Sequence, residues 1–296
     1  MAKKRMRDSL RASCRMIIAA LATLSVLGCD NQAATEGTST GTVPSEQPGA
    51  IEKEDFGMLL EKTELGVTDE TVGSREFGSV SEVALRINNG EVTIAQDESL
   101  LPGEVRIGWE VRRNGRKVRG KRSGLEIYFS QELGELSVED ERIGNGTRVP
   151  SLHLNVRMAP GVSVETSLGN GDIRANADFI DGLDLGNGNI DFHGSLRKGA
   201  DIHLGNGMLT GDLQGVSGRH SIYVGNGTVE IALASGVNCN LNGSVAVGNI
   251  DLYGKYRGNV DRHGFVGATA TALIGEEAGN LLSVDIGSGG LQIGSN

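Results

Sequence analysis

The sequence has few cysteine, proline and aromatic residues. Its 296 residues include only 3 cysteines, 5 prolines, 1 tryptophan and 4% aromatic residues. Cys14 and Cys29 lie within the first 29 residues, so Cys239 is the one cysteine in the rest of the chain. A disulfide within that part is excluded, and the fold must be held by packing and hydrogen bonding.

Basic residues are also scarce beyond the N-terminus. The formal net charge is −10, although the first 29 residues carry six basic residues and one acidic residue. The remainder holds 22 basic and 37 acidic residues. Nucleic-acid binding needs a positive surface to replace phosphate counterions. The composition therefore predicts no nucleic-acid partner.

Sequence signatures of common catalytic and metal sites are absent. No Gly-x-Ser-x-Gly elbow and no phosphate-binding loop occur. None of the five histidines has zinc-ligand spacing to another histidine or to a cysteine; they are His153, His193, His203, His220 and His263. We therefore predict no metal, no cofactor and no catalytic residue.

What is present begins with an export signal. Basic residues 1–15 precede an apolar run over residues 16–28, which is shorter than the ~20 residues of a spanning helix. Val26-Leu27-Gly28-Cys29 resembles the bacterial lipobox, with Val26 where leucine is more usual. The resemblance implies that residues 1–29 are a lipoprotein signal. Acylated Cys29 would then bind membrane lipid and anchor the protein in the cell envelope. The alternative is ordinary cleavage that leaves a secreted protein.

Three further segments differ in composition. Residues 30–55 begin with a polar run rich in Thr, Ser and Gly, which predicts a flexible linker. Residues 56–75 suit a short amphipathic helix and a connector. From residue 76 the apolar residues alternate, and Asn114-Gly115 is a strong hairpin signal. We therefore predict a β-hairpin-rich entry region ahead of the main fold.

A repeat in the second half of the chain predicts the fold. Glycine accounts for 45 residues, and Gly-Asn-Gly recurs between apolar residues from position 164 onward. The first glycines of the copies lie at 169, 186, 205 and 225, which gives intervals of 17, 19 and 20 residues. A period of ~20 residues fits one coil of a β-solenoid. We predict an all-β, single-stranded β-solenoid, or β-helix, over residues 76–296, with repeats clearest over 164–296.

The asparagines at the centre of the copies are predicted to form a column. Stacked amides hydrogen-bond along the axis of repeated β-structures, and asparagine tolerates the turn conformation. Val247-Gly248-Asn249-Ile250 is interpreted as a shortened copy, with Val247 and Ile250 in the core. The predicted turn ladder comprises Asn170, Asn187, Asn206, Asn226 and Asn249.

Two segments are candidates for partner contacts. The chain ends shortly after a degenerate copy at 286–291 with no capping helix, so its open last rung would invite self-association. A basic hairpin between 106 and 122 either contacts an anionic lipid or glycan surface or simply keeps the hairpin soluble. Its candidate contact residues are Arg112, Arg113, Arg116, Lys117, Arg119, Lys121 and Arg122.

Asn88-Asn89-Gly90-Glu91-Val92, residues 152–171 and the Gly-Asn-Gly repeats resemble the bacterial putative-adhesin family and autotransporter-adhesin head domains. The resemblance covers residues 76–296 and implies the solenoid; the family's function is unknown. The expected protein is a non-enzymatic, lipid-anchored envelope protein whose solenoid serves adhesion, scaffolding or the binding of proteins or glycans. The alternative is a polysaccharide lyase or glycosidase, for which Asp191 and Glu230 could supply paired carboxylates.

Replacing the lipobox cysteine tests the anchor. Cys29→Ala removes the thiol that would be acylated, so we expect the protein to move from the membrane fraction to the soluble fraction. Fractionation of cells that produce the wild-type or variant chain measures this. A variant that stays in the membrane fraction would show that Cys29 is not the anchor.

Overall fold

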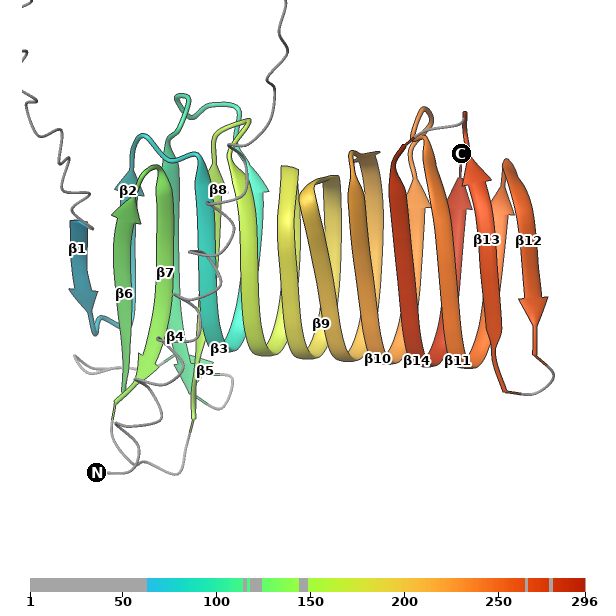
Figure 1. The fold of residues 1–296 in the computed structure, drawn as a ribbon. Helices are drawn as coiled ribbons and strands as arrows, with labels where there is room; N and C mark the ends of the chain where they lie inside the picture. The colour runs from blue at the N-terminus through green and yellow to red at the C-terminus, as the bar shows by residue number, and fades with distance from the viewer. Residues whose placement is uncertain are drawn as a thin grey trace, which may run out of the picture. The chain divides into compact units, whose positions relative to one another are not determined.

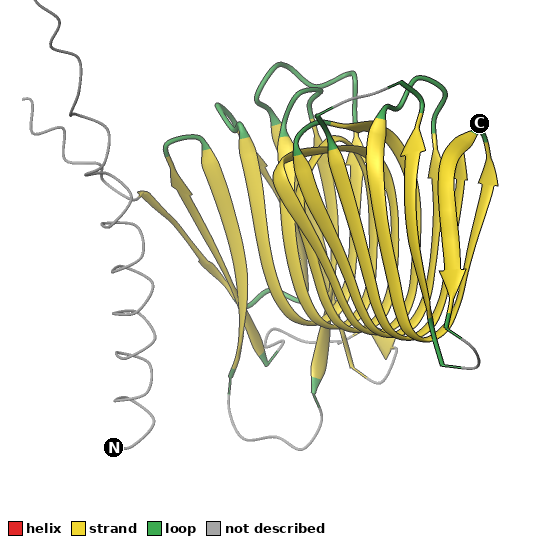
Figure 2. Cartoon of the chain, turned by 45° about the vertical axis from the view of Figure 1, so that its right-hand side comes forward, coloured by secondary structure: helices red, strands yellow, loops and turns green. Residues whose placement is uncertain are grey.

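The computed structural model describes residues 63–113, 116–117, 124–143, 149–263, 266–276 and 279–295. They belong to one compact unit that starts at Met58, while Cys29 and the predicted linker lie outside the described residues. Every regular element in these ranges is a strand, and they contain no helix that could span a membrane. The all-β prediction is confirmed (Figure 2).

The strands form one extended sheet system. Their bounds are β1 (Thr63–Thr68), β2 (Val72–Phe77), β3 (Glu82–Gln96), β4 (Val105–Arg113), β5 (Arg116–Lys117), β6 (Leu125–Glu132), β7 (Glu135–Arg142), β8 (Pro150–Met158), β9 (Ser163–Val216), β10 (Arg219–Leu233), β11 (Cys239–Gly254), β12 (Tyr256–Arg262), β13 (Ala268–Ile274) and β14 (Leu281–Ser295).

The repeats form the rungs of a solenoid. Strands β3, β9, β10, β14 and β11 lie side by side in parallel register, and they bend at the Gly-Asn-Gly motifs or at the residues that take their place (Figure 1). We call the residues before the corner the first arm of a rung and those after it the second arm. First arms stack on first arms and second arms on second arms, so the rungs build two faces around one core. The predicted β-solenoid is confirmed.

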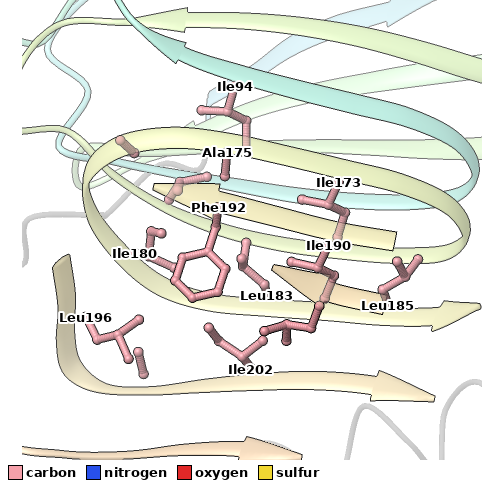
Figure 3. Close-up of a cluster of buried hydrophobic side chains, with 14 of the residues drawn as sticks. Ile94, Ile173, Ala175, Ile180, Leu183, Leu185, Ile190, Phe192, Leu196 and Ile202 are labelled. Carbon is pink, nitrogen blue, oxygen red and sulfur yellow. The ribbon is translucent and has the colours of Figure 1, made fainter. Parts of the chain in front are cut away.

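Alternating residues of each arm fill the core between the two faces. Figure 3 shows Ile173 from one rung of β9, and Ile190 and Phe192 from the next rung, pointing into this interior. All three are buried, and the burial of each large apolar side chain contributes roughly 1.5–3 kcal/mol. One column of buried residues runs through every rung and comprises Val92, Ile173, Ile190, Leu209, Val229, Leu291 and Ile250.

The N-terminal end of the core is closed by antiparallel strands. Strands β1, β6 and β7 extend the first-arm face, whereas β2, β4 and β8 extend the second-arm face. Phe129 lies between Phe77 and Trp109, with ring centroids 5.6 and 5.5 Å away. Gly73 leaves room for the indole, because a Cβ there would lie 2.2 Å from Trp109 Cζ2. The aromatic rings therefore plug this end.

Residues 63–77 differ from the sequence prediction. The expected short helix and connector over residues 56–75 is wrong for the described part, where β1 and β2 form instead. β1 pairs with β6, with Val67 opposite Tyr128, and β2 pairs with β4. Pairing with distant strands overrides a local apolar pattern, which is why the short-range signal failed.

The C-terminal segment is an inner rung of the solenoid. β14 lies between β10 and β11, with Leu291 opposite both Val229 and Ile250. The expected open last rung at the C-terminus is therefore wrong for this segment. The chain first continues from β11 into β12 and then β13, which pairs with β11, and it then returns to fill the position between two earlier rungs.

The copy at 245–250 also differs from its sequence interpretation. Gly248 lies opposite Gly289, and Val245 lies opposite Ile286. The apolar spacing of five residues from Val245 to Ile250 is thus retained, and the copy is not shortened. Val247 is consequently 52% exposed rather than in the core. Asn249 lies opposite Gly290, outside the asparagine column, so its assignment to the turn ladder was wrong.

Two neighbouring glycines provide a matched test of the corner. A Cβ on Gly289, whose φ is +144°, would lie 1.6 Å from the Gly227 carbonyl oxygen, whereas a Cβ on Gly290 has nothing within 4 Å. We expect Gly289→Ala to lower the free energy of unfolding by about 2–4 kcal/mol. Gly290→Ala should change it by less than about 0.5 kcal/mol. Denaturant unfolding measures both, and equal effects would contradict the corner geometry.

Candidate binding surfaces

The asparagine column follows the corners of five rungs. From the second rung onward each amide nitrogen donates to the amide oxygen of the preceding rung, over 2.9–3.0 Å, which makes four bonds. The column consists of Asn89, Asn170, Asn187, Asn206 and Asn226. Sequence reasoning missed Asn89, although Ile87 and Val92 flank it with the same apolar spacing. All four hydrogen bonds link one corner to the next, so we assign the column a structural role.

A half-buried carboxylate on β7 caps the N-terminal end of the column of corners. Asp140 Oδ1 accepts hydrogen bonds from the backbone N–H of Asn88 at 2.7 Å and from its Nδ2 at 2.9 Å. Burial raises the pKa of Asp140 above its usual 3.8, and the two bonds from Asn88 oppose that rise. A raised carboxyl pKa favours the folded state at low pH, so this contribution declines as the pH rises through the shifted value.

An outward column on the first-arm face carries mixed side chains. His203 Nδ1 lies 3.0 Å from Asp184 Oδ1, and the His203 ring stacks on Tyr223 with centroids 5.1 Å apart. Tyr223 is 47% exposed, and Asp285 of β14 is its neighbour on the next rung. Outward positions have no packing partner in the core, so their side chains are free to vary and to meet ligands.

A polar cleft of about 300 Å³ crosses the second-arm face over several rungs. His193 Nδ1 lies 3.0 Å from Asp212 Oδ2, which orients the imidazole. No described residue hydrogen-bonds to the side chain of Gln96 or Asn176. The described lining contains no arginine or lysine and consists of Gln96, Glu98, Asn176, Ala177, Asp178, His193, Gly194, Ser195 and Gln214.

The basic hairpin is only partly described. Strands β4 and β5 pair antiparallel with Arg113 opposite Arg116 and Arg112 opposite Lys117. Arg112 Nε lies 2.6 Å from Glu110 Oε1, so one of the basic residues of the hairpin already forms an ion pair within β4. The remaining candidates Arg119, Lys121 and Arg122 lie outside the described residues. Contact with an anionic surface stays a prediction.

The two carboxylates considered for chemistry lie on an open face of the described chain rather than in its cleft. Glu230 lies beside Thr210, and Asp191 is one rung further along, so two rungs or about 10 Å separate the carboxylates. Both are exposed, and neither lines the cleft. Burial raises the pKa of the Cys239 thiol to about 11, which makes it a poor nucleophile at neutral pH. No cluster of metal-binding side chains occurs among the described residues.

The fold defines a β-solenoid protein, and comparisons with known proteins add little to that. No family model matches the sequence, and no curated protein matches it. The chain is similar to a putative cell adhesion protein from Clostridium sporogenes, with 14% identity, 76% of this chain and 100% of that chain covered, and a TM-score of 0.44. A putative adhesin from Bacteroides fragilis shows 10% identity, 78% and 100% coverage, and a TM-score of 0.34. At these values neither likeness indicates a function.

Removing one amide tests the asparagine column. Asn206→Ala breaks the bonds to Asn187 and Asn226 at an exposed corner, where water replaces part of the loss. We expect the free energy of unfolding to fall by about 0.5–1.5 kcal/mol. Asn249→Ala is the matched control, because this exposed amide lies outside the column. A similar loss in both variants, measured by denaturant unfolding, would rule out a specific contribution from the column.

Proposed function

We propose that the protein is a non-enzymatic, adhesion-type binding protein of the cell envelope, which displays the faces of its solenoid to a glycan or protein. Acylation of Cys29 would attach it to the membrane, and the polar residues after Cys29 would hold the solenoid away from the lipid. The rungs would then act as a rigid frame for outward side chains.

The observation that carries this proposal is the cleft around His193. Its amide groups donate and accept hydrogen bonds and its carboxylates accept them, which suits the hydroxyl groups of a sugar chain. Gln96 and Asn176 keep their hydrogen-bonding groups available for a ligand. Because the described lining contains no arginine or lysine, we expect neutral or amino sugars to be favoured over sulfated or uronic acid polymers.

The cleft also suits binding better than turnover. Hydrolysis of a glycosidic bond needs two carboxyl groups across the bond, at ~5–10 Å. The cleft offers Glu98 and Asp178, but Asp178 Oδ2 accepts the backbone N–H of Gly161 at 3.0 Å. That bond ties Asp178 to the turn before β9. The polysaccharide-active alternative therefore gains no specific support from these residues.

Binding of the full chain to a glycan array tests the proposal. We expect wild-type protein to bind neutral or amino-sugar glycans, and Gln96→Ala combined with Asn176→Ala to weaken binding by roughly tenfold, because several sugar hydrogen bonds are lost. Asn242→Ala is the matched control, since it removes an exposed amide from the first-arm face. A wild-type chain that binds no glycan, or a double variant that binds as wild type, would reject the cleft as the binding site.

A further inference from the structure

Strand β12 is the outermost strand of the first-arm face at the C-terminal end. It pairs with β13 along one edge, and no other described strand pairs with its second edge (Figure 1). Both of its faces are open to solvent: six of its seven residues are exposed, and Val260 is half-buried. An edge with free backbone groups is a template for another strand.

The sequence of β12 is complementary to itself when it is read in the opposite direction. In Tyr-Arg-Gly-Asn-Val-Asp-Arg the central residue is Asn259. Antiparallel pairing about Asn259 sets Arg257 opposite Asp261 of a second copy, and the twofold symmetry produces this pair twice. The same register sets Gly258 opposite Val260. All seven positions then have a compatible partner.

The sides of the strand agree with this register. Arg257, Asn259 and Asp261 lie opposite Leu273, Thr271 and Thr269 of β13 and project from the outer side of the sheet. The opposite side carries Tyr256 and Val260, whose partners on β13 are the buried Ile274 and Ala270. Charged pairs would therefore form on the outer side, and on the side that continues the core Val260 would face Gly258 while Tyr256 would face Arg262.

One charged residue of β12 has no ion-pair partner among the described residues. Asn259 Nδ2 donates to Asp261 Oδ1 at 2.6 Å, and Arg262 lies 3.3 Å from Asp251. Arg257 has no hydrogen bond and no ion pair with any described residue. An exposed, unpaired arginine on an unpaired strand edge fits an acidic group on an incoming strand, and Asp261 of a second copy supplies one in this register.

We propose that β12 is the contact strand of a homodimer, in which two copies pair antiparallel through Tyr256–Arg262 about a twofold axis at Asn259. The first-arm faces of the two copies join into one continuous sheet. A seven-residue strand pair is small for a permanent interface, so the dimer forms in a concentration-dependent equilibrium. The occupant is a second copy because the complementarity belongs to the strand itself.

Charge reversal tests the register in the full chain, purified in detergent. Arg257→Asp and Asp261→Arg each place like charges opposite one another twice, so each variant should associate at least about tenfold more weakly than wild type in sedimentation equilibrium. The double variant restores both pairs and should associate within about threefold of wild type. A mixture of the two single variants should form a 1:1 heterodimer, because their charges are mutually complementary.

Edge charges also serve to prevent strand pairing, and the same measurements separate the two roles. If the charges of β12 are only protective, the single variants will not weaken association and the double variant will rescue nothing, which overturns the proposal. A wild-type chain that stays monomeric at millimolar concentration overturns it as well. All substituted side chains are exposed, and an unchanged unfolding midpoint verifies that the variants are folded.

Crosslinking provides a second, independent readout. In the proposed dimer Asn259 faces its own copy across one strand spacing, about 5 Å, whereas Thr271 of β13 is three spacings from its copy, about 14 Å. Asn259→Cys should therefore give a crosslinked dimer with a short bis-maleimide, above the level of the wild-type chain, and Thr271→Cys should not. Cys239 is buried and contributes little background. Equal crosslinking of the two variants would place the axis elsewhere.

Discussion

The close approach of successive rungs at the Gly-Asn-Gly corner is the constraint on which the structure depends. The second glycine of each corner lies with its missing Cβ position against the backbone carbonyl of the rung before it, as at Gly188 against Gly171 and Gly207 against Gly188. Any side chain there would force the rungs apart. Because the corner holds the rungs at strand spacing, the buried columns on both faces stack directly on one another.

This arrangement separates stability from recognition. Corner glycines and inward apolar residues carry the fold, and they repeat from rung to rung. Outward residues contribute little to packing and differ between rungs, as the neighbours Asp184, His203 and Tyr223 show. A binding surface can therefore change along such a frame without loss of the core, which is the physical basis for proposing a display role.

The two ends of the solenoid are treated differently. At the N-terminal end, paired antiparallel strands and the ring of Phe129 between Phe77 and Trp109 close the core. At the other end, β13 and β12 extend the first-arm face, and β12 is left with an unpaired edge among the described strands. An exposed edge on a regular sheet normally needs protection against pairing with other strands. The self-complementary charges of β12 lie on such an edge, which is why they bear on the choice of its partner.

The sequence by itself determined the coil. Its Gly-Asn-Gly period and alternating apolar residues identify the β-solenoid, because each rung must turn tightly and bury one side of each arm. The order of the rungs was decided only by the tertiary structure: nothing local in residues 281–295 indicates that β14 fits between β10 and β11. Successive rungs carry the same apolar pattern, so the pattern alone does not say which rungs become neighbours. Asn249 follows a glycine and precedes an apolar residue, so the sequence suggests a corner asparagine. Val245 and Ile250 pack opposite Ile286 and Leu291, however, and this register places Asn249 outside the column.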